Sequence, residues 1–349
     1  MNKLSRFTLA SLGFLFFISS SVISQEIEEV VVTATKKAES IQDLALSIEA
    51  FTSESIEANM IEDASDLQEV VPGLIVDKGI GSGVSYAIRG TGSYGVGAAV
   101  VGAVVVATNG HDSSSSAFVD IGFFDVERVE VLRGPQGTLF GANTTGGVVN
   151  IVTKAPSGEY NGKVQVTAGD WNRFDVKAAA DLPINEKLSL RLSGFHHGRD
   201  GFITNVYDGS DMGSIDVNSI RATLKYDAGN GFAATWRNEI LRSKNGAPYI
   251  GMGAYPGEAE YVAPGTIAGP NAGVQYTGYC MPVGSPCRAP DEYYSANSSE
   301  QDMSDMNIDA STLKMVWNDT SLGTITSITS FKQFDLHEYT DQDLSLIHI

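Results

Sequence analysis

Polar and hydrophobic residues alternate along successive segments of the chain from Tyr160 onward. One segment carries Val164 and Val166 at every second position, and a later one carries Leu190 and Leu192 in the same way. Because successive side chains of a β-strand point to opposite faces, each segment predicts a strand with one apolar face. The intervening positions are polar and include Gln165, Thr167, Asp175, Lys177, Arg191, Arg221 and Arg237. We therefore expect a sheet that is apolar outside and polar inside.

The connections between these segments differ in length in a regular way. The turns LPINEK, DAGNG and NDTSLG are short, whereas residues 199–213 and 243–305 form long connections. Short turns at one end and long loops at the other are typical of an outer-membrane β-barrel. A secreted sandwich would also alternate, but it would bury its apolar face and would not separate its loops so regularly. Residues 159–349 therefore predict the first strands, about seven, of an antiparallel transmembrane β-barrel.

The N-terminus has the organisation of a secretory signal peptide. Lys3 and Arg6 precede an almost wholly apolar run over residues 7–18, and small residues follow before Gln25. As a helix this run would be about 18 Å long, which is too short to cross a hydrocarbon core of about 30 Å. We expect residues 1–24 to be a cleaved signal rather than a membrane anchor. The net charge of -19 argues against a nucleic-acid partner.

The two cysteines, Cys280 and Cys287, are separated by six residues in CMPVGSPC. In an exported protein the simple prediction is a small disulfide loop. A zinc site would lack ligands, because the sequence offers no nearby histidine and no second cysteine pair. We expect no metal and no cofactor. We also expect no enzymatic activity, since the sequence has no Gly-x-Ser-x-Gly motif and no convincing carboxylate pair.

Residues 25–158 have a different pattern. They contain short strands such as residues 86–89, candidate amphipathic helices at residues 41–59 and 64–71, and many glycines. A small mixed α/β domain that precedes a barrel is expected to plug its lumen. The glycines between Gly134 and Gly147 are expected to let the backbone turn where a side chain would collide with the surrounding wall. A phosphate-binding loop is disfavoured, because GPQGTLFG lacks the Gly-Lys-Ser/Thr ending.

Three stretches carry a resemblance to a known family. EEVVVTA at residues 28–34, AIRGTG at residues 87–92 and, most specifically, VERVEVLRGPQGTLFGANTTGGVVNIVTK at residues 126–154 resemble motifs of the TonB-dependent outer-membrane receptors. The resemblance implies a plug domain at residues 36–158 inside a barrel of about 22 strands when complete, located in the outer membrane of a Gram-negative bacterium.

The same resemblance implies a function and partners. Family members take up a large, scarce nutrient with energy delivered by TonB, which works with ExbB and ExbD. The expected ligand is a ferric siderophore, with a saccharide or cobalamin as alternatives. A passive, plugged porin-like channel is a further alternative, against which the plug motifs argue.

Residues 25–35 correspond to the segment that contacts TonB in this family. The contact residues implied by the resemblance are Glu29, Val30, Val31, Val32, Thr33 and Ala34. A β-branched run of this kind can add a strand to the sheet edge of a partner, where main-chain hydrogen bonds supply affinity. The local pattern alone is equally consistent with a first strand of the plug.

Arg89 and Arg133 resemble the two plug arginines that pair with carboxylates on the inner wall of the barrel in this family. An arginine buried in a plugged lumen needs such partners, because an unpaired charge there is costly. Glu127 and Glu130 are expected to join this network. A plain salt bridge between plug and wall, made by the same residues, is the less specific alternative.

A set of loop residues is expected to face the ligand. It comprises Ser93, Tyr94, Asn109, His111, Tyr249, Tyr255 and Tyr279. The tyrosines offer rigid amphipathic surfaces that suit either a chelate or a sugar ring.

The chain ends at DLSLIHI, after far fewer predicted strands than a plugged barrel requires. Open barrel edges would expose unpaired backbone groups to lipid. We therefore expect a partial barrel, truncated at its C-terminus, that does not transport by itself. The wall carboxylates for Arg89 and Arg133 are then expected in the missing part.

Overall fold

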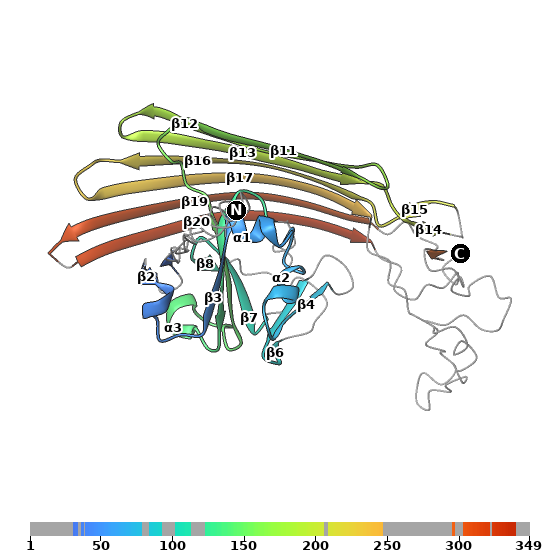
Figure 1. The fold of residues 1–349 in the computed structure, drawn as a ribbon, viewed down its shortest axis with the longest axis horizontal. Coiled ribbons are helices and arrows are strands. Elements are labelled where there is room, and N and C mark those ends of the chain that lie inside the picture. The colour runs from blue at the N-terminus through green and yellow to red at the C-terminus, as the bar shows by residue number, and fades with distance from the viewer. Residues whose placement is uncertain are drawn as a thin grey trace, which may run out of the picture.

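The computed structural model describes residues 31–33, 36–37, 39–78, 84–92, 102–112, 123–205, 209–246, 295–296, 303–321 and 323–339. These residues form a curved sheet of long strands, which we call the wall, and a smaller mixed domain formed by the elements β1 to β10, which we call the plug. Figure 1 shows the plug on the concave side of the wall.

The wall is an antiparallel sheet of seven strands in which almost every strand pairs with its neighbours along the chain. The strands are β11 (Asn161–Gly169), β12 (Arg173–Asn185), β13 (Leu188–Arg199), β16 (Ile215–Asp227), β17 (Phe232–Gly246), β19 (Met303–Thr320) and β20 (Gly323–Tyr339). Among the described residues β11 and β20 are the two edges of this sheet, which is therefore open. This confirms the predicted start of an antiparallel barrel. Three short strands lie in the connections, β14 (Ile203–Asn205), β15 (Asp211–Met212) and β18 (Ser295–Ala296).

The two faces of the wall have the predicted character. Large apolar side chains are exposed on the convex face, among them Val164, Phe174, Ile220, Trp236 and Phe331. The concave face buries polar side chains such as Asp181, Arg191, Ser219, Arg221 and Thr223. An apolar outer face and a polar inner face are what a barrel in lipid requires.

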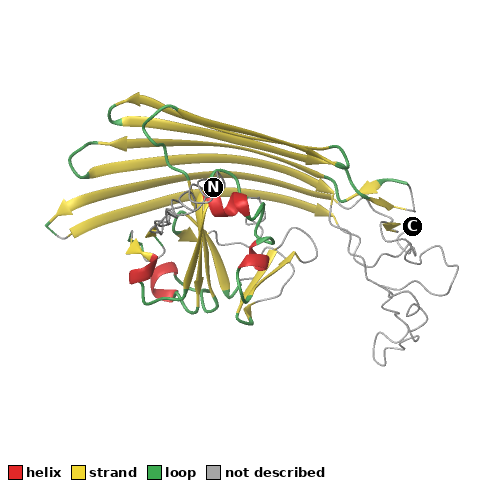
Figure 2. Cartoon of the chain, in the orientation of Figure 1, coloured by secondary structure: helices red, strands yellow, loops and turns green. Residues whose placement is uncertain are grey.

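The plug is built around a five-stranded sheet in the order β3 (Ile48–Thr52), β9 (Val126–Arg133), β10 (Gly147–Thr153), β7 (Val104–Thr108) and β8 (His111–Asp112). A second sheet contains β4 (Leu74–Lys78), β5 (Val84–Ile88) and β6 (Thr91–Gly92). The short helices are α1 (Ser53–Ala58), α2 (Leu67–Val70) and α3 (Gly137–Phe140). In Figure 2 the helices of the described residues lie in the plug. No described helix is long and apolar enough to cross a membrane.

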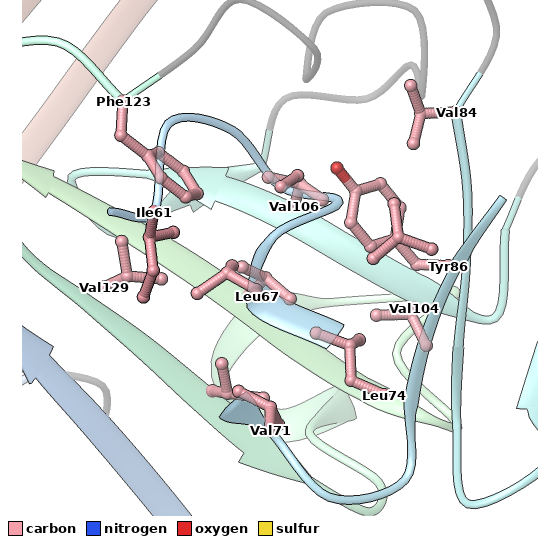
Figure 3. Packing of buried hydrophobic residues seen from close by; sticks show 14 of the residues in the cluster. Ile61, Leu67, Val71, Leu74, Val84, Tyr86, Val104, Val106, Phe123 and Val129 are labelled. Atoms are coloured by element: carbon pink, nitrogen blue, oxygen red, sulfur yellow. The ribbon is translucent and has the colours of Figure 1, made fainter. Parts of the chain in front are cut away.

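The plug core lies between the two plug sheets and α2. Val129 of β9 and Val106 of β7 pack with Leu67 of α2 and with Tyr86 of β5 in one cluster of buried residues. Figure 3 shows these side chains converging from the different elements. The burial of aliphatic side chains on this scale gives the plug a core of its own.

Two sequence-based expectations about the plug were wrong. Residues 41–59 were expected to form one helix, but they contain a 3-10 turn at Ile41–Asp43, the strand β3 and then α1. The amphipathic pattern was outweighed by the pairing of β3 with β9. The second error concerns Gly146 and Gly147, where an added Cβ would collide with plug backbone, the carbonyl oxygens of Thr91 and Leu132 respectively, rather than with the wall.

Candidate functional site

The described part of the predicted TonB-contact segment is docked on the plug. Val31–Val32 forms β1, which pairs with β2 at Glu39–Ser40. The side chain of Val32 is fully buried, whereas Val31 remains 44% exposed. Glu29, Val30 and Ala34 lie outside the described residues, as do residues 1–24.

Glu130 holds this segment from the middle of β9. Its Oε1 accepts hydrogen bonds from the backbone N–H and the hydroxyl of Thr33 at 2.8 and 3.3 Å. Arg128 Nε donates to the same oxygen at 2.8 Å, and Asn150 Nδ2 donates to Oε2 at 2.8 Å. Arg128 also pairs with Glu127 and donates to the Thr33 hydroxyl. The fully buried carboxylate of Glu130 is therefore paired and hydrogen-bonded, as a buried charge must be.

The two predicted lock arginines have their described contacts inside the plug. Arg89 Nη2 donates to the Ser47 hydroxyl at 3.1 Å. Arg133 forms an ion pair with Glu49 of β3 at 2.7 Å. No carboxylate in the described part of the wall pairs with either arginine. A contact with a wall carboxylate beyond the described residues stays a prediction.

An ion pair joins plug and wall with the carboxylate on the plug and the arginine on the wall, the reverse of the predicted arrangement. The sequence did not indicate this pair. Asp125, directly before β9, accepts two hydrogen bonds from Arg191 of β13, at 2.9 Å from Nε and 2.5 Å from Nη2. The side chains are only 4% and 11% exposed, and Arg191 also pairs with Asp181 of β12 at 2.8 Å. We call Asp125 and Arg191 the interface pair. Arg191 could be recognised as inward-facing from its strand pattern, but its partner lies 66 residues away and depends on the docking of the plug.

The charge state of Asp125 follows from these contacts. Burial disfavours its carboxylate, but the hydrogen bonds and charge of Arg191 outweigh burial and hold the pKa of Asp125 below its ordinary value. Asp125 also has a φ of 52°, a conformation that is costly for most residues and that Asp tolerates better than others. A residue with a positive φ thus carries the carboxylate that contacts Arg191 of the wall.

Phe124, the preceding residue, is a second anchor. Its ring lies 5.0 Å from that of Phe195, in a buried cluster with Leu241 and Ile308 of the wall. Its carbonyl oxygen accepts a hydrogen bond from Arg221 Nη1 at 3.2 Å. Arg221 is in turn held by Glu239 through two hydrogen bonds of 2.9 and 3.1 Å. Two consecutive plug residues thus contact several wall strands at once.

The outer rim of the interface carries weaker contacts. Arg173 of β12 donates to both oxygens of Glu62, at 2.9 and 2.7 Å, and Lys163 of β11 pairs with Glu57. The plug partners of these pairs, Glu62 and Glu57, are more than half exposed to solvent. Each pair therefore contributes little to the docking of the plug on the wall. Between them and the interface pair lies a cleft of about 1010 Å³ that Glu57, Glu62, Lys163 and Arg191 help to line.

Of the predicted ligand-facing residues, only Asn109 and His111 are described, and both lie in the β7–β8 hairpin. Asn109 Oδ1 accepts hydrogen bonds from the backbone N–H and hydroxyl of Thr153, at 3.0 and 3.2 Å. His111 Nε2 lies 3.3 Å from the hydroxyl of Ser330, midway along β20. Burial, together with the charges of Lys332, Arg237 and Lys36, lowers the pKa of His111 to about 4. These contacts are with plug and wall, and a ligand-facing role stays a prediction.

The remaining predicted site residues lie outside the described part of the chain. They are Ser93, Tyr94, Tyr249, Tyr255, Tyr279, Cys280 and Cys287. Within the described part, no three His, Cys, Asp or Glu side chains are placed to hold a metal ion.

Comparison with known proteins gives a consistent result. Residues 40–148 match the family described as TonB-dependent Receptor Plug Domain. The chain is 32% identical over 204 residues to the iron-regulated outer membrane virulence protein of Vibrio cholerae serotype O1, an alignment that covers 54% of this chain and 31% of the relative. It is 32% identical over 173 residues to the vitamin B12 transporter BtuB of Photobacterium profundum, covering 49% of this chain and 28% of that protein. The matched segments thus span about a third of the length of these relatives.

Solved structures share the fold at lower identity. The ferric yersiniabactin uptake receptor FyuA from Yersinia pestis superposes with a TM-score of 0.66 at 19% identity, covering 84% of this chain and 41% of that one. The ferripyoverdine receptor of Pseudomonas aeruginosa, bound to ferripyoverdine, gives a TM-score of 0.66 at 16% identity, covering 88% and 37%. Residues 40–148 thus match the plug domain of the TonB-dependent receptors, and the chain with its open antiparallel wall is similar to outer-membrane receptors of this kind.

Proposed function

We propose that this chain serves in the uptake of a large, scarce nutrient across the outer membrane, driven by TonB, and that the nutrient is a ferric siderophore. The proposal is supported by a relative described as iron-regulated and by fold neighbours described as ferric yersiniabactin and ferripyoverdine receptors. The relatives described as vitamin B12 transporters make cobalamin the second candidate. In this proposal residues 25–35 contact TonB, residues 36–158 are the plug and residues 159–349 begin the barrel.

The observation that carries the proposal is the placement of β9 between two attachments. Glu130 of β9 holds Thr33 of the N-terminal segment, and Asp125, one residue before β9, is held by Arg191 of the wall. A pull on the N-terminal segment would therefore act on the same strand whose start is fixed to the wall. In this arrangement a pull by TonB on the N-terminal segment would be transmitted to β9. The interface pair would oppose this force until the plug separates from the wall.

A binding experiment with Val31→Pro tests the TonB contact. Val31 is the position of choice because it is half exposed, whereas Val32 is buried and its replacement would disturb the plug. Proline removes a backbone donor that strand addition to a partner needs. Val31→Thr keeps both the donor and β-branching and serves as the matched control. We expect the purified periplasmic domain of TonB to bind the wild-type chain and Val31→Thr, and to lose binding to Val31→Pro. Equal binding of all three would place the contact elsewhere.

Uptake by cells tests the nutrient. Deletion of the gene that encodes this chain is expected to abolish the accumulation of a ferric siderophore under iron starvation, and a protonophore is expected to have the same effect on the parent strain. Cobalamin accumulation is measured in parallel. A loss confined to cobalamin would replace the siderophore with the second candidate, and unchanged accumulation of both would contradict the proposal.

A further inference from the structure

A shallow hollow lies on the convex face of the wall, which Figure 1 shows on the side away from the plug. Its volume is about 420 Å³, and the neighbouring strands β12, β13, β16 and β17 form it. Ala178 and Gly194 are direct cross-strand partners at its centre, and neither has a side chain beyond Cβ. Val176, Ile220 and Ile240 border them, and the two isoleucines are 67% and 51% exposed. The hollow is therefore an apolar depression between larger apolar side chains.

A row of polar side chains, which we call the polar row, borders the hollow along one side. It consists of His196 of β13, Asn218 of β16 and Arg242 of β17, which are consecutive cross-strand partners. Each lies two positions from a residue of the hollow on the same strand and therefore on the same face. On all three strands the step from the hollow to the polar row leads toward the long connections at residues 199–213 and 243–305. Long connections lie on the outer side of an outer-membrane barrel, so the polar row marks the outer end of the hollow.

The guanidinium of Arg242 is fixed in position and already charge-paired. Its Nη2 donates to Asp309 at 2.9 Å, and its Nη1 donates to the carbonyl oxygens of Leu241 and Ile308 at 2.8 and 3.1 Å. Within the described part of the chain, Nε of Arg242 has no such acceptor. Because Asp309 compensates its charge, this remaining N–H group suits an uncharged carbonyl oxygen better than a second anion.

We propose that the hollow binds one acyl chain of a membrane lipid, and that Nε of Arg242 donates a hydrogen bond to the carbonyl group through which this chain is linked. The outward-facing apolar side chains of a barrel contact lipid tails. The change from the apolar hollow to the polar row places a hydrogen-bond donor where a tail joins its head group. Each methylene group that leaves water or detergent for the hollow adds to the affinity. The inference depends on the wall lying in the outer membrane and not on which nutrient is taken up.

Photolabelling of the purified chain in detergent tests the site. The probe is a phosphatidylethanolamine with two ester-linked acyl chains, one of which carries a diazirine, and the labelled residues are mapped by mass spectrometry. We expect saturable labelling that is concentrated on the residues of β12, β13, β16 and β17 around the hollow. Labelling spread evenly over the apolar face of the wall would show only non-specific lipid contact and would overturn the proposal.

A pair of identical substitutions locates the binding. Ala178→Leu fills the hollow and is expected to weaken probe binding about tenfold, which corresponds to the loss of roughly two buried methylene groups. Ala222→Leu is the matched control, because Ala222 is the cross-strand partner of the exposed Leu192 on the same face but does not line the hollow. The control is expected to bind the probe as the wild type does. Equal affinities of the wild type and Ala178→Leu would contradict binding in the hollow.

A second probe tests the carbonyl contact on the wild-type chain, so that this test needs no variant to fold. The diether analogue has the same head group and chains but no carbonyl groups, and we expect it to bind about fivefold more weakly, through the loss of one hydrogen bond. Arg242→Met is expected to bind the ester and ether probes equally. Equal affinity of the wild type for both probes would overturn the role of Arg242. Because neither TonB nor a nutrient is present, a failure here is distinct from a failure of the proposed uptake.

Discussion

Replacing Asp125 by asparagine should loosen the plug from the wall more than any other single isosteric change at this interface. The carboxylate of Asp125 accepts two hydrogen bonds from Arg191 and is almost completely buried. Asparagine keeps the shape but removes the charge, and it turns one acceptor into a donor that faces a guanidinium. The change therefore breaks the interface pair without creating a cavity.

The size of the effect can be worked out from the contacts. A hydrogen bond to a charged group contributes about 1.5–3 kcal/mol, and leaving a buried charge without any partner costs about 3–5 kcal/mol. Arg191 keeps Asp181 as a partner, so the full penalty is not reached. We expect Asp125→Asn to lower the free energy of plug release by about 2–3 kcal/mol, which is roughly a 30- to 150-fold increase in the released population.

Hydrogen exchange of the amides in β9 measures this release. Glu62→Gln is the matched control, because it also removes a carboxylate that a wall arginine holds, but Glu62 is 54% exposed. In the control variant the free energy of plug release, obtained from the exchange rates, is expected to change by less than about 1 kcal/mol. If Asp125→Asn accelerates exchange no more than Glu62→Gln, the interface pair does not hold the plug.

Two further predictions concern pH and backbone geometry. The pKa of His111 is lowered to about 4, so between its ordinary pKa of about 6.5 and that value the unfolded chain binds more protons than the folded one. The free energy of unfolding should therefore fall as the pH drops from about 6.5 to 4. In His111→Gln the free energy of unfolding should depend less on pH between about 6.5 and 4. The same pH dependence in the variant and in the wild type would show that His111 does not cause it. Gly147→Ala should destabilise the plug by more than about 2 kcal/mol in a denaturant titration, because its φ is 150° and a Cβ would overlap the carbonyl oxygen of Leu132. Gly158 also has a positive φ, but an added Cβ would meet no close neighbour, so Gly158→Ala should lower the free energy of unfolding by less. Equal losses of stability in the two variants would contradict the steric explanation.

The wall was the most predictable part of the structure. Strict alternation at Val164 and Val166 and at Leu190 and Leu192 fixes which face of a strand is apolar, and a strand needs only its own residues to show this. The short turns and long connections then set the order of the strands. Arg191 could be assigned to the inner face for the same reason.

The plug and its contacts were less predictable, because they depend on partners distant in sequence. The segment at residues 48–52 looks helical in isolation, but it pairs with β9 some eighty residues later, and long-range pairing outweighed local preference. The interface pair was missed for the same reason, since nothing around Asp125 distinguishes it from other carboxylates until the plug is docked. The role of Glu130 as the residue that holds Thr33 likewise follows only from the fold.

The central claim is that the residues preceding the wall are seated on its inner face, and a crosslink between His111 and Ser330 tests it most directly. These side chains are 219 residues apart in sequence and lie within 3.3 Å of each other. Cysteines are introduced at both positions, with Cys280 and Cys287 replaced by serine, and the membrane-embedded protein is treated with a short thiol-specific crosslinker. The account predicts efficient intramolecular crosslinking of the double variant, and none when the second cysteine is placed instead at Phe331, on the opposite face of β20. Equal crosslinking at Ser330 and Phe331, or none at either, would contradict the seating of the plug against the wall.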